Sequence, residues 1–246
     1  MKTSKDTYGK EIWERFKGKG DLEMIERDDG YTERSPGYVS QYFLPYKKWP
    51  ASERSAVRLI KGRVLDIGCG AGRHSLYLQE KGFDVIAIDN SPMAIKVCKL
   101  RGVKKAKVLS IMQTGRFKPG SFETIIMLGN NFGLMGSFKQ ARSLLKKFHK
   151  ITGPDAVIIA DTIDPYRTDF QPHLKYQAWN RKRGRMSGQL RIRVRFGKQS
   201  GPWFDYLFVS REELKKILAG TGWKIKKLIN TKSPKYFMVL HKNLAA

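Results

Sequence analysis

The stretch Val64-Leu65-Asp66-Ile67-Gly68-Cys69-Gly70-Ala71-Gly72 decides the fold of this 246-residue chain. A short apolar run ends in glycines at alternate positions, and a helical pattern follows over 74–78. Glycine has no Cβ, so such a turn lets the backbone approach a ligand closely. The following helix presents unpaired N–H groups, which favour an anionic ligand group such as a carboxylate. The stretch therefore predicts a ligand-binding unit of strand, turn and helix.

Alternating strands and helices are predicted after this stretch. The strand-like runs are 85–88, 108–112, 122–128, 156–160, 223–228 and 236–240. Ser91-Pro92 and Ser137 are typical starts of helices, and a further helix is expected over 211–218. Such alternation favours a doubly wound, mostly parallel α/β sheet, in which ligands bind beyond the carboxyl ends of the strands.

Asp89 narrows the kind of ligand. It closes the second apolar strand, where its carboxylate can accept hydrogen bonds from two ribose hydroxyls. A nicotinamide dinucleotide site would need a third glycine where this chain has Arg73. The pattern therefore indicates a nucleoside-bearing ligand of a different kind.

Two segments, 64–72 and Ile86-Ala87-Ile88-Asp89-Asn90-Ser91-Pro92, resemble the first two motifs of class I S-adenosylmethionine-dependent methyltransferases. The resemblance covers roughly residues 60 to 163. It implies a Rossmann-like, seven-stranded sheet in which 236–240 is an antiparallel strand near the edge. It also implies that Asp66 and the glycine turn hold the methionine part of S-adenosylmethionine, while Asp89 holds its ribose.

The chain departs from the family after the third strand. Many members have an acidic residue there that binds the adenine amino group, whereas this chain has Ile111-Met112-Gln113. Apolar packing by Ile111 and Met112 is expected instead. The cofactor-binding residues expected from the resemblance are Asp66, Gly68, Cys69, Gly70, Gly72, Asp89, Asn90, Ile111, Met112 and Gly129.

The acceptor is expected to meet the segment after the fourth strand, Gly129-Asn130-Asn131-Phe132. This segment loosely resembles the motif of methyltransferases that act on exocyclic amines of nucleobases, although the prolines of that motif are missing. Asn130 and Asn131 would accept hydrogen bonds from the amine, and Phe132 would stack on the base. These three are the catalytic candidates. The alternative is that Asn130 contacts only the donor and that Asn131 only shapes a turn.

The charge of the chain suggests a polyanionic partner. Lysine and arginine number 48 against 22 acidic residues, which gives a net charge of +26. Between Asp169 and Asp205 there is no acidic residue, and Arg191, Arg193 and Arg195 alternate with apolar residues on an expected hairpin strand. Such arginines stand about 6.6 Å apart, which is comparable to the spacing of phosphates on a nucleic acid strand. The expected RNA-binding residues are Arg181, Arg183, Arg185, Arg191, Arg193 and Arg195; the alternative is a solvated basic face.

Composition and charge lead to an expected domain organisation. We expect an N-terminal helical and aromatic lid over 1–50, a methyltransferase core over 51–164 and 211–246, and a basic substrate-recognition insertion over 165–210. No apolar run approaches the ~20 residues of a membrane span, and the start lacks a signal-peptide pattern, so a cytoplasmic protein without membrane partners is expected. Two cysteines and no Cys/His spacing argue against a metal site.

Three functions follow from these patterns. The first is methylation of a nucleobase in ribosomal or transfer RNA, for example at cytosine N4 or adenine N6. The second is methylation of a small molecule or protein, with the aromatic residues between 31 and 46 lining an acceptor pocket. The third is RNA binding without turnover. The sequence leaves the oligomeric state open.

Overall fold

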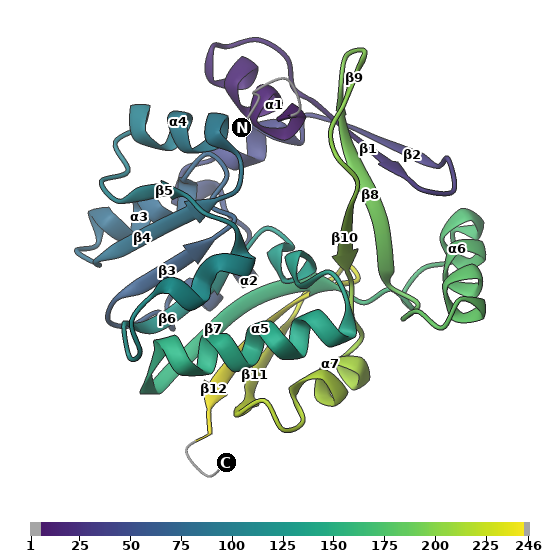
Figure 1. The fold of residues 1–246 in the computed structure, drawn as a ribbon. Coiled ribbons are helices and arrows are strands. Elements are labelled where there is room, and N and C mark those ends of the chain that lie inside the picture. Colours follow the sequence, from purple (N-terminus) through teal and green to yellow (C-terminus); the bar gives the residue numbers. More distant parts are fainter. Residues whose placement is uncertain (1–5, 244–246) are drawn as a thin grey trace. The chain divides into compact units, whose positions relative to one another are not determined.

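The computed structural model describes residues 6–243 and contains a seven-stranded sheet with the strand order β11-β12-β7-β6-β3-β4-β5 (Figure 1). The strands are β3 (Val64–Ile67), β4 (Val85–Asp89), β5 (Ala106–Val108), β6 (Phe122–Met127), β7 (Thr152–Ile163), β11 (Trp223–Asn230) and β12 (Lys235–Lys242). The pairs β4/β5 and β6/β7 are parallel, whereas β12 runs antiparallel to β7 and β11. The expected Rossmann-like, mostly parallel sheet is thus confirmed, including its antiparallel strand.

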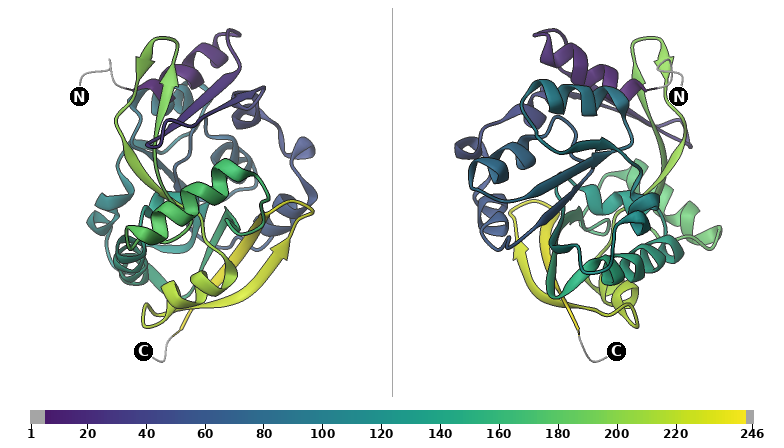
Figure 2. Two further views of the ribbon diagram at one scale, coloured as in Figure 1. Left: turned by 90° about the vertical axis from the view of Figure 1, so that its right-hand side faces the viewer. Right: turned by 60° about the vertical axis from the view of Figure 1, so that its left-hand side comes forward.

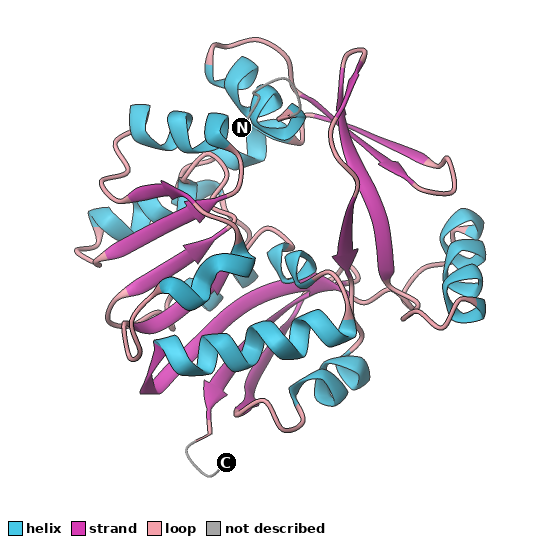
Figure 3. Cartoon of the chain, in the orientation of Figure 1, coloured by secondary structure: helices cyan, strands magenta, loops and turns pink. Residues whose placement is uncertain are grey.

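The helices that alternate with these strands are α2 (Ala51–Val57), α3 (Arg73–Glu80), α4 (Pro92–Leu100), α5 (Phe138–Ile151) and α7 (Arg211–Leu218) (Figure 3). Their starts follow the sequence signals. The hydroxyls of Ser91 and Ser137 accept N–H bonds from Ala94 and Gln140, and Ser210 forms a complete capping box. The predicted N-caps of α4 and α5 are therefore confirmed, and local sequence defines where these helices begin.

The chain divides into two compact units. One comprises Met1–Trp49, Leu65–Ile111 and Arg191–Phe204, and the other Pro50–Val64, Met112–Leu190 and Asp205–Ala246. The expected boundary near residue 50 coincides with a unit boundary, but the expected insertion 165–210 is divided between the units. Residues 1–5 of the expected lid and 244–246 of the expected core lie outside the described residues, as does most of the start that was searched for a signal peptide.

The first unit contains a smaller sheet with the order β10-β8-β1-β2, and β9 pairs with β8. Its elements are β1 (Leu22–Arg27), β2 (Thr32–Pro36), β8 (Gln189–Phe196), β9 (Gln199–Ser200) and β10 (Phe204–Leu207), of which the last begins in this unit. The expected strand at 190–196 and its partner at 203–206 are present. The β1–β2 hairpin was not expected, because Leu22 to Pro36 lacks a clean alternation of apolar and polar residues.

The helix α1 (Thr7–Phe16) packs against α4 in this unit. Short 3-10 helices over Val39–Phe43 and Tyr46–Lys48 follow the β1–β2 hairpin. A further one covers Ile111–Arg116, so the expected third strand over 108–112 is wrong, and that strand is Ala106–Val108. The third-strand error arose because 108–112 looks apolar, although Val108 is 48% exposed.

In the second unit, the segment expected to have little helical character contains α6 (Gln171–Lys182). Its buried residues include the polar Gln177 and Asn180 beside Tyr176, so it lacks the apolar stripe by which a helix is usually recognised. Figure 2 shows α6 together with the antiparallel pair β11 and β12, drawn in yellow. Within the described residues, no helix combines the length and the apolar character of a membrane span.

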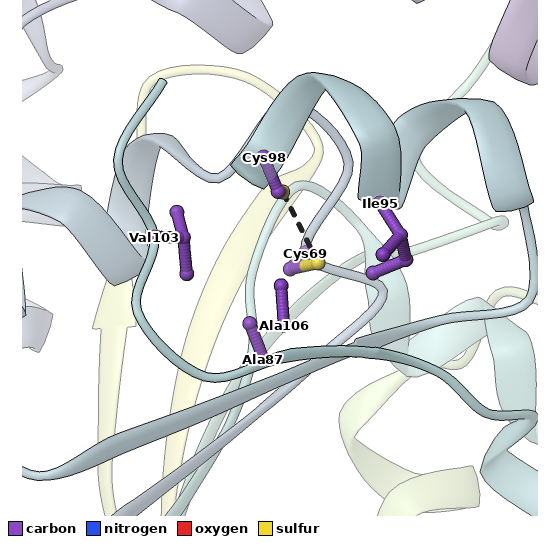
Figure 4. Packing of buried hydrophobic residues seen from close by; sticks show 6 residues of the cluster. All are labelled: Cys69, Ala87, Ile95, Cys98, Val103 and Ala106. Atoms are coloured by element: carbon purple, nitrogen blue, oxygen red, sulfur yellow. Dashed lines mark hydrogen bonds between the residues drawn. The ribbon is translucent and has the colours of Figure 1, made fainter. Parts of the chain in front are cut away.

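Both cysteines are packing residues, as the sequence indicated. Cys69 and Cys98 are free and buried, with their Sγ atoms 3.6 Å apart (Figure 4). They belong to an apolar cluster with Ala87, Ile95, Val103 and Ala106. This cluster fixes α4 behind the glycine turn. The described residues contain no group of three metal-ligating side chains.

Candidate functional site

The glycine turn adopts the backbone that its sequence requires. Gly68, Gly70 and Gly72 have φ of 72°, 54° and 79°, which L-residues with a side chain rarely adopt. A Cβ on Gly72 would lie 2.8 Å from Val103 and 2.9 Å from the Cys98 sulfur, so the turn is also packed too closely for any side chain there. The helix α3 starts directly after Gly72.

Asp89 is bound to this turn. It ends β4, is 5% exposed, and accepts N–H bonds from Gly70 at 3.0 Å on Oδ2 and from Ser91 at 2.9 Å on Oδ1. Burial raises its pKa to about 6, the two backbone N–H groups oppose that rise, and Asp6 and Asp66 add to it. Each carboxylate oxygen retains a further lone pair, so the residue can accept hydrogen bonds from the hydroxyls of a ribose. Asn90 follows at an exposed position.

Asp66 lies deeper than Asp89. It is 1% exposed, and the Ser75 hydroxyl donates to its Oδ2 at 2.6 Å. Burial raises its pKa, while His74 and the Ser75 hydroxyl lower it. Asp66 therefore connects β3 to α3 beneath the turn, and its contact with the methionine part of the donor stays a prediction.

Asp6, which precedes α1, and Tyr8 on α1 complete this half of the site, and neither is among the residues expected from the sequence. Asp6 caps α1 and also accepts from the Ser91 hydroxyl at 2.8 Å and from the Met93 N–H at 3.1 Å. The Tyr8 hydroxyl lies 2.9 Å from where a Cβ of Gly70 would stand. The N-cap pattern at Asp6 predicts the start of the helix, but nothing local to Tyr8 indicates that it reaches the glycine turn.

The aromatic residues of the N-terminal segment mostly pack on one another. The rings of Tyr46 and Tyr77 are stacked at 4.2 Å, and Trp49 contacts His74 edge-on at 4.8 Å. Tyr38 and Tyr42 also meet edge-on, at 5.8 Å. Their main role is thus packing around α3 and the glycine turn, and only part of this set is available to line an acceptor pocket.

In the second unit, Asn130 follows the carboxyl end of β6 with a left-handed backbone, φ 65°. Its N–H donates to Asp161 Oδ2 at 2.9 Å, and the Tyr206 hydroxyl donates to its carbonyl at 2.7 Å. The Lys235 ammonium pairs with the same Asp161 oxygen at 2.6 Å. The side-chain oxygen of Asn130 is buried and makes no hydrogen bond with any described residue. It is therefore a free acceptor in a fixed position.

The other residues expected to contact the acceptor or the adenine differ in how far they are buried. Phe132 is fully buried, so its expected stacking on a base is wrong: the ring is a core side chain of the 3-10 helix Asn131–Met135. Asn131 is half-buried at the start of that helix, and its contact with an acceptor stays a prediction. Gly129, which directly precedes Asn130, has a φ of 82°. Ile111 is half-buried and Met112 is 43% exposed, and their contact with adenine is likewise still a prediction.

The arginines expected to bind RNA are partly engaged within the protein. Arg193 makes a two-pronged pair with Glu26, with contacts of 3.0 and 2.8 Å, and stacks on Trp203 at 4.5 Å. Arg195 reaches the same carboxylate at 3.3 Å. Glu26 comes from β1, far away in the sequence, which explains why the absence of acids near the arginines misrepresented their surroundings. Arg191 is half-buried on the same strand.

The arginines near α6 have neutral partners. Arg181 donates to the Ser187 hydroxyl at 3.0 Å. Arg183 donates to the Asn180 side chain at 2.7 Å and lies 3.2 Å from the centre of the Trp179 ring. One terminal nitrogen of Arg185 is buried without a partner. Their positive charge is thus not balanced by these contacts.

Comparison with known proteins identifies the family. A family model described as a methyltransferase domain matches residues 38–228. A solved SAM-dependent methyltransferase from Bacteroides fragilis, in complex with S-adenosyl-L-homocysteine, is 30% identical with a TM-score of 0.83, and the match covers 99% of this chain and 98% of that one.

Curated relatives match over shorter stretches. A glycine/sarcosine N-methyltransferase from Halorhodospira halochloris is 34% identical over 104 residues, which are 40% of this chain and 39% of the relative. A ubiquinone biosynthesis O-methyltransferase from Xanthomonas euvesicatoria is 35% identical over 74 residues, 28% and 31% of the two chains. The match therefore spans well under half the length of these two relatives. The methyltransferase family model covers more than half of the residues of this chain. The chain therefore belongs to the class I S-adenosylmethionine-dependent methyltransferases, with S-adenosylmethionine as its cofactor.

Proposed function

We propose that the chain transfers a methyl group from S-adenosylmethionine to a nitrogen atom of a small-molecule acceptor. The observation that carries this proposal is the buried, unpartnered side-chain oxygen of Asn130. A buried acceptor without a donor is costly unless a ligand supplies one. An amine or amide N–H is such a donor, and it lies on the same atom that would receive the methyl group.

The residues around Asn130 hold that oxygen in place. Asp161 and Tyr206 bind the N–H and the carbonyl of the Asn130 backbone, and Lys235 holds the Asp161 carboxylate. S-adenosylmethionine supplies a methyl group already activated on its sulfonium, so the protein's tasks are positioning and exclusion of water. By accepting an N–H, Asn130 would orient the acceptor nitrogen and leave its lone pair free for attack on the methyl carbon.

Two findings support a small molecule over RNA. Glu26 already binds Arg193 and Arg195, two of the six arginines expected to bind RNA. Among the relatives, one is named for glycine and sarcosine and another for ubiquinone biosynthesis. A nucleobase in RNA is the second candidate, favoured by the net charge of +26 and by Arg181 and Arg183, which donate to the neutral side chains of Ser187 and Asn180.

The test uses the purified chain with methyl-labelled S-adenosylmethionine, offered glycine, sarcosine, a small-molecule extract and total RNA in separate reactions. Label should appear on nitrogen in a small-molecule reaction. Label in RNA alone, or on oxygen or carbon, would refute the proposal. Asn130→Gly keeps the left-handed backbone without strain and deletes the oxygen, so it should lower the rate 100-fold or more on the scale of a lost polar contact in the transition state, roughly. Its melting temperature controls for folding.

A further inference from the structure

Glu11, on α1, is a buried carboxyl group that has no hydrogen-bond partner within residues 6–243. The residue is 3% exposed, and neither carboxylate oxygen makes a hydrogen bond. Burial raises its pKa to about 9, the neighbouring Glu23 adds to that rise, and only the nearby backbone N–H of Met24 opposes it. Such a group is costly to bury unless a cation or a donor meets it.

Glu23 brings a second carboxylate to the same place from β1. It accepts a hydrogen bond from the Tyr42 hydroxyl at 2.8 Å. Burial raises its pKa to about 7, Tyr42 opposes the rise, and Glu33 on β2 adds to it. Because Glu23 has the lower pKa, it ionises first, and its charge then keeps the proton on Glu11.

Neither carboxyl group pairs with a lysine or arginine of the described residues. This is notable in a chain with 48 basic and 22 acidic residues. Nearby acids do find cations: Glu14 pairs with Lys17 at 2.6 Å, and Glu26 pairs with Arg193 at 2.8 Å. In the part of the chain that the structure describes, Glu11 and Glu23 therefore have no cationic partner, although the neighbouring acids do.

Two tyrosines connect the acidic pair to the glycine turn. The Tyr8 and Tyr42 rings meet edge-on at 5.9 Å. Tyr8 reaches Gly70 with its hydroxyl, and Tyr42 lies 4.0 Å from where a Cβ of Gly70 would stand. Burial raises the pKa of Tyr8 well above its ordinary value, and the charges of Asp89, Glu23 and Glu11 add to that rise. The acidic pair is thus next to the donor half of the site.

We propose that Glu11 and Glu23, together with the rings of Tyr8 and Tyr42, bind a protonated amino group of the small-molecule acceptor. This inference rests on the proposed function and names the substrate class: a small molecule with an ammonium group besides the neutral nitrogen that accepts the methyl group, since a protonated nitrogen has no lone pair to attack the methyl carbon. An ammonium group donates up to three hydrogen bonds, which the carboxyl oxygens of Glu11 and Glu23 can accept, and aromatic faces add a favourable cation–π contact. Such a group would supply the hydrogen bonds that the Glu11 oxygens do not receive from the described residues.

The first experiment measures binding without turnover. The whole protein, saturated with S-adenosylhomocysteine, is melted in methylammonium chloride and in sodium chloride of equal ionic strength. Methylammonium should raise the melting temperature by about 2 °C or more over sodium, as expected for a ligand that binds only the folded state. Tetramethylammonium, which has no N–H, should raise it less.

Variants assign that shift to the acidic pair. Glu11→Gln and Glu23→Gln should abolish the methylammonium effect, whereas Glu14→Gln, one helical turn along α1 and on the surface, should keep it. Equal shifts in all variants, or none in the wild type, would overturn the proposal. The glutamine variants should fold, because each removes a buried group that resists ionisation.

A second measurement separates the acceptor from the amino-acid end of the donor. Calorimetry should give affinities for S-adenosylhomocysteine within twofold of wild type in Glu11→Gln. A tenfold loss, with unchanged affinity for 5′-methylthioadenosine, would place the donor's own ammonium at Glu11 and refute the assignment to the acceptor. Since neither measurement needs methyl transfer, a failed transfer assay would count against the proposed function and leave these results to be judged separately.

Discussion

At the scale of single residues, Asp89 makes donor binding depend on pH. Its pKa of about 6 means that the carboxylate is ionised above that pH and loses hydrogen-bond acceptors as the pH falls below it. We predict that affinity for S-adenosylhomocysteine is constant above pH 7 and falls up to tenfold per unit well below pH 6, roughly, as proton linkage requires. Calorimetry between pH 5 and 8 measures this. Asp89→Asn should weaken binding and flatten the profile, whereas Asp84→Asn on the surface should do neither.

The buried carboxyl group of Glu11 should lower the free energy of unfolding at neutral pH. Its pKa is about 9 in the folded chain against an ordinary 4.5, so the folded state keeps a proton that the unfolded state has lost. Stability therefore decreases as the pH rises from 4.5 toward 9. We predict that Glu11→Gln stabilises the fold by on the order of 3 kcal/mol at pH 7, since each pH unit contributes about 1.4 kcal/mol.

Urea unfolding at several pH values tests this prediction. The advantage of Glu11→Gln over wild type should grow from pH 5 to pH 8 and vanish near pH 4. Glu14→Gln, whose carboxylate pairs with Lys17 at the surface, should show no such growth. A stabilisation that does not change with pH would contradict the assigned pKa.

At the scale of elements, the sequence correctly predicted the features that depend on neighbouring residues alone. The glycine turn, Asp89 at the end of β4, and the caps at Ser91 and Ser137 follow from short-range sterics and hydrogen bonds, and all are present. The contacts of Tyr8 and Glu11 could not be foreseen, because they depend on how α1 packs against α4 and on the small sheet.

The small sheet shows the same limit. Its arginines seemed free because their nearest acid, Glu26, lies on β1, about 167 positions away in the sequence. The Asn130 side chain was predicted to be an acceptor from its position after a strand, and its unpartnered oxygen is consistent with that role. Phe132 was misjudged because the sequence alone does not distinguish a core aromatic residue from an exposed one beside a site.

Pairing between β1 and β8 should stabilise this sheet modestly. Glu26 is opposite Arg193 in the register and pairs with two arginines. The hydrogen bond from Arg193, together with the positive charges of Arg193 and Arg195, lowers the pKa of Glu26 from its ordinary value. The pair is partly exposed, so we predict that Glu26→Gln costs about 1 kcal/mol at neutral pH. A double-mutant cycle with Arg193→Gln, measured by urea unfolding at low and high salt, gives the coupling. Zero coupling at low salt would mean that the stacking on Trp203, and not the pairing with Glu26, holds Arg193 in place.

At the scale of the whole molecule, the net charge of +26 acts on every polyanion. Affinity that comes from this field falls linearly with the logarithm of salt concentration and carries no sequence preference. Binding to RNA in a low-salt buffer would therefore not by itself identify RNA as the substrate. A specific RNA site and general attraction by the net charge differ in which arginines determine how steeply RNA affinity falls with salt concentration.

Two matched double variants distinguish these cases. Arg181 donates to the Ser187 hydroxyl and Arg183 to the Asn180 side chain, so at these contacts a phosphate does not compete with a carboxylate. We predict that Arg181→Gln with Arg183→Gln lowers the salt slope for single-stranded RNA by about 1.4, at ~0.7 per phosphate contact. Arg193→Gln with Arg195→Gln should change it by less than half as much, because Glu26 already binds both side chains. Fluorescence anisotropy between 20 and 200 mM salt, roughly, covers the range in which such slopes are measured. A larger effect of the Arg193 and Arg195 substitutions would show that RNA displaces Glu26 from these side chains. It would support the expectation that β8 binds RNA.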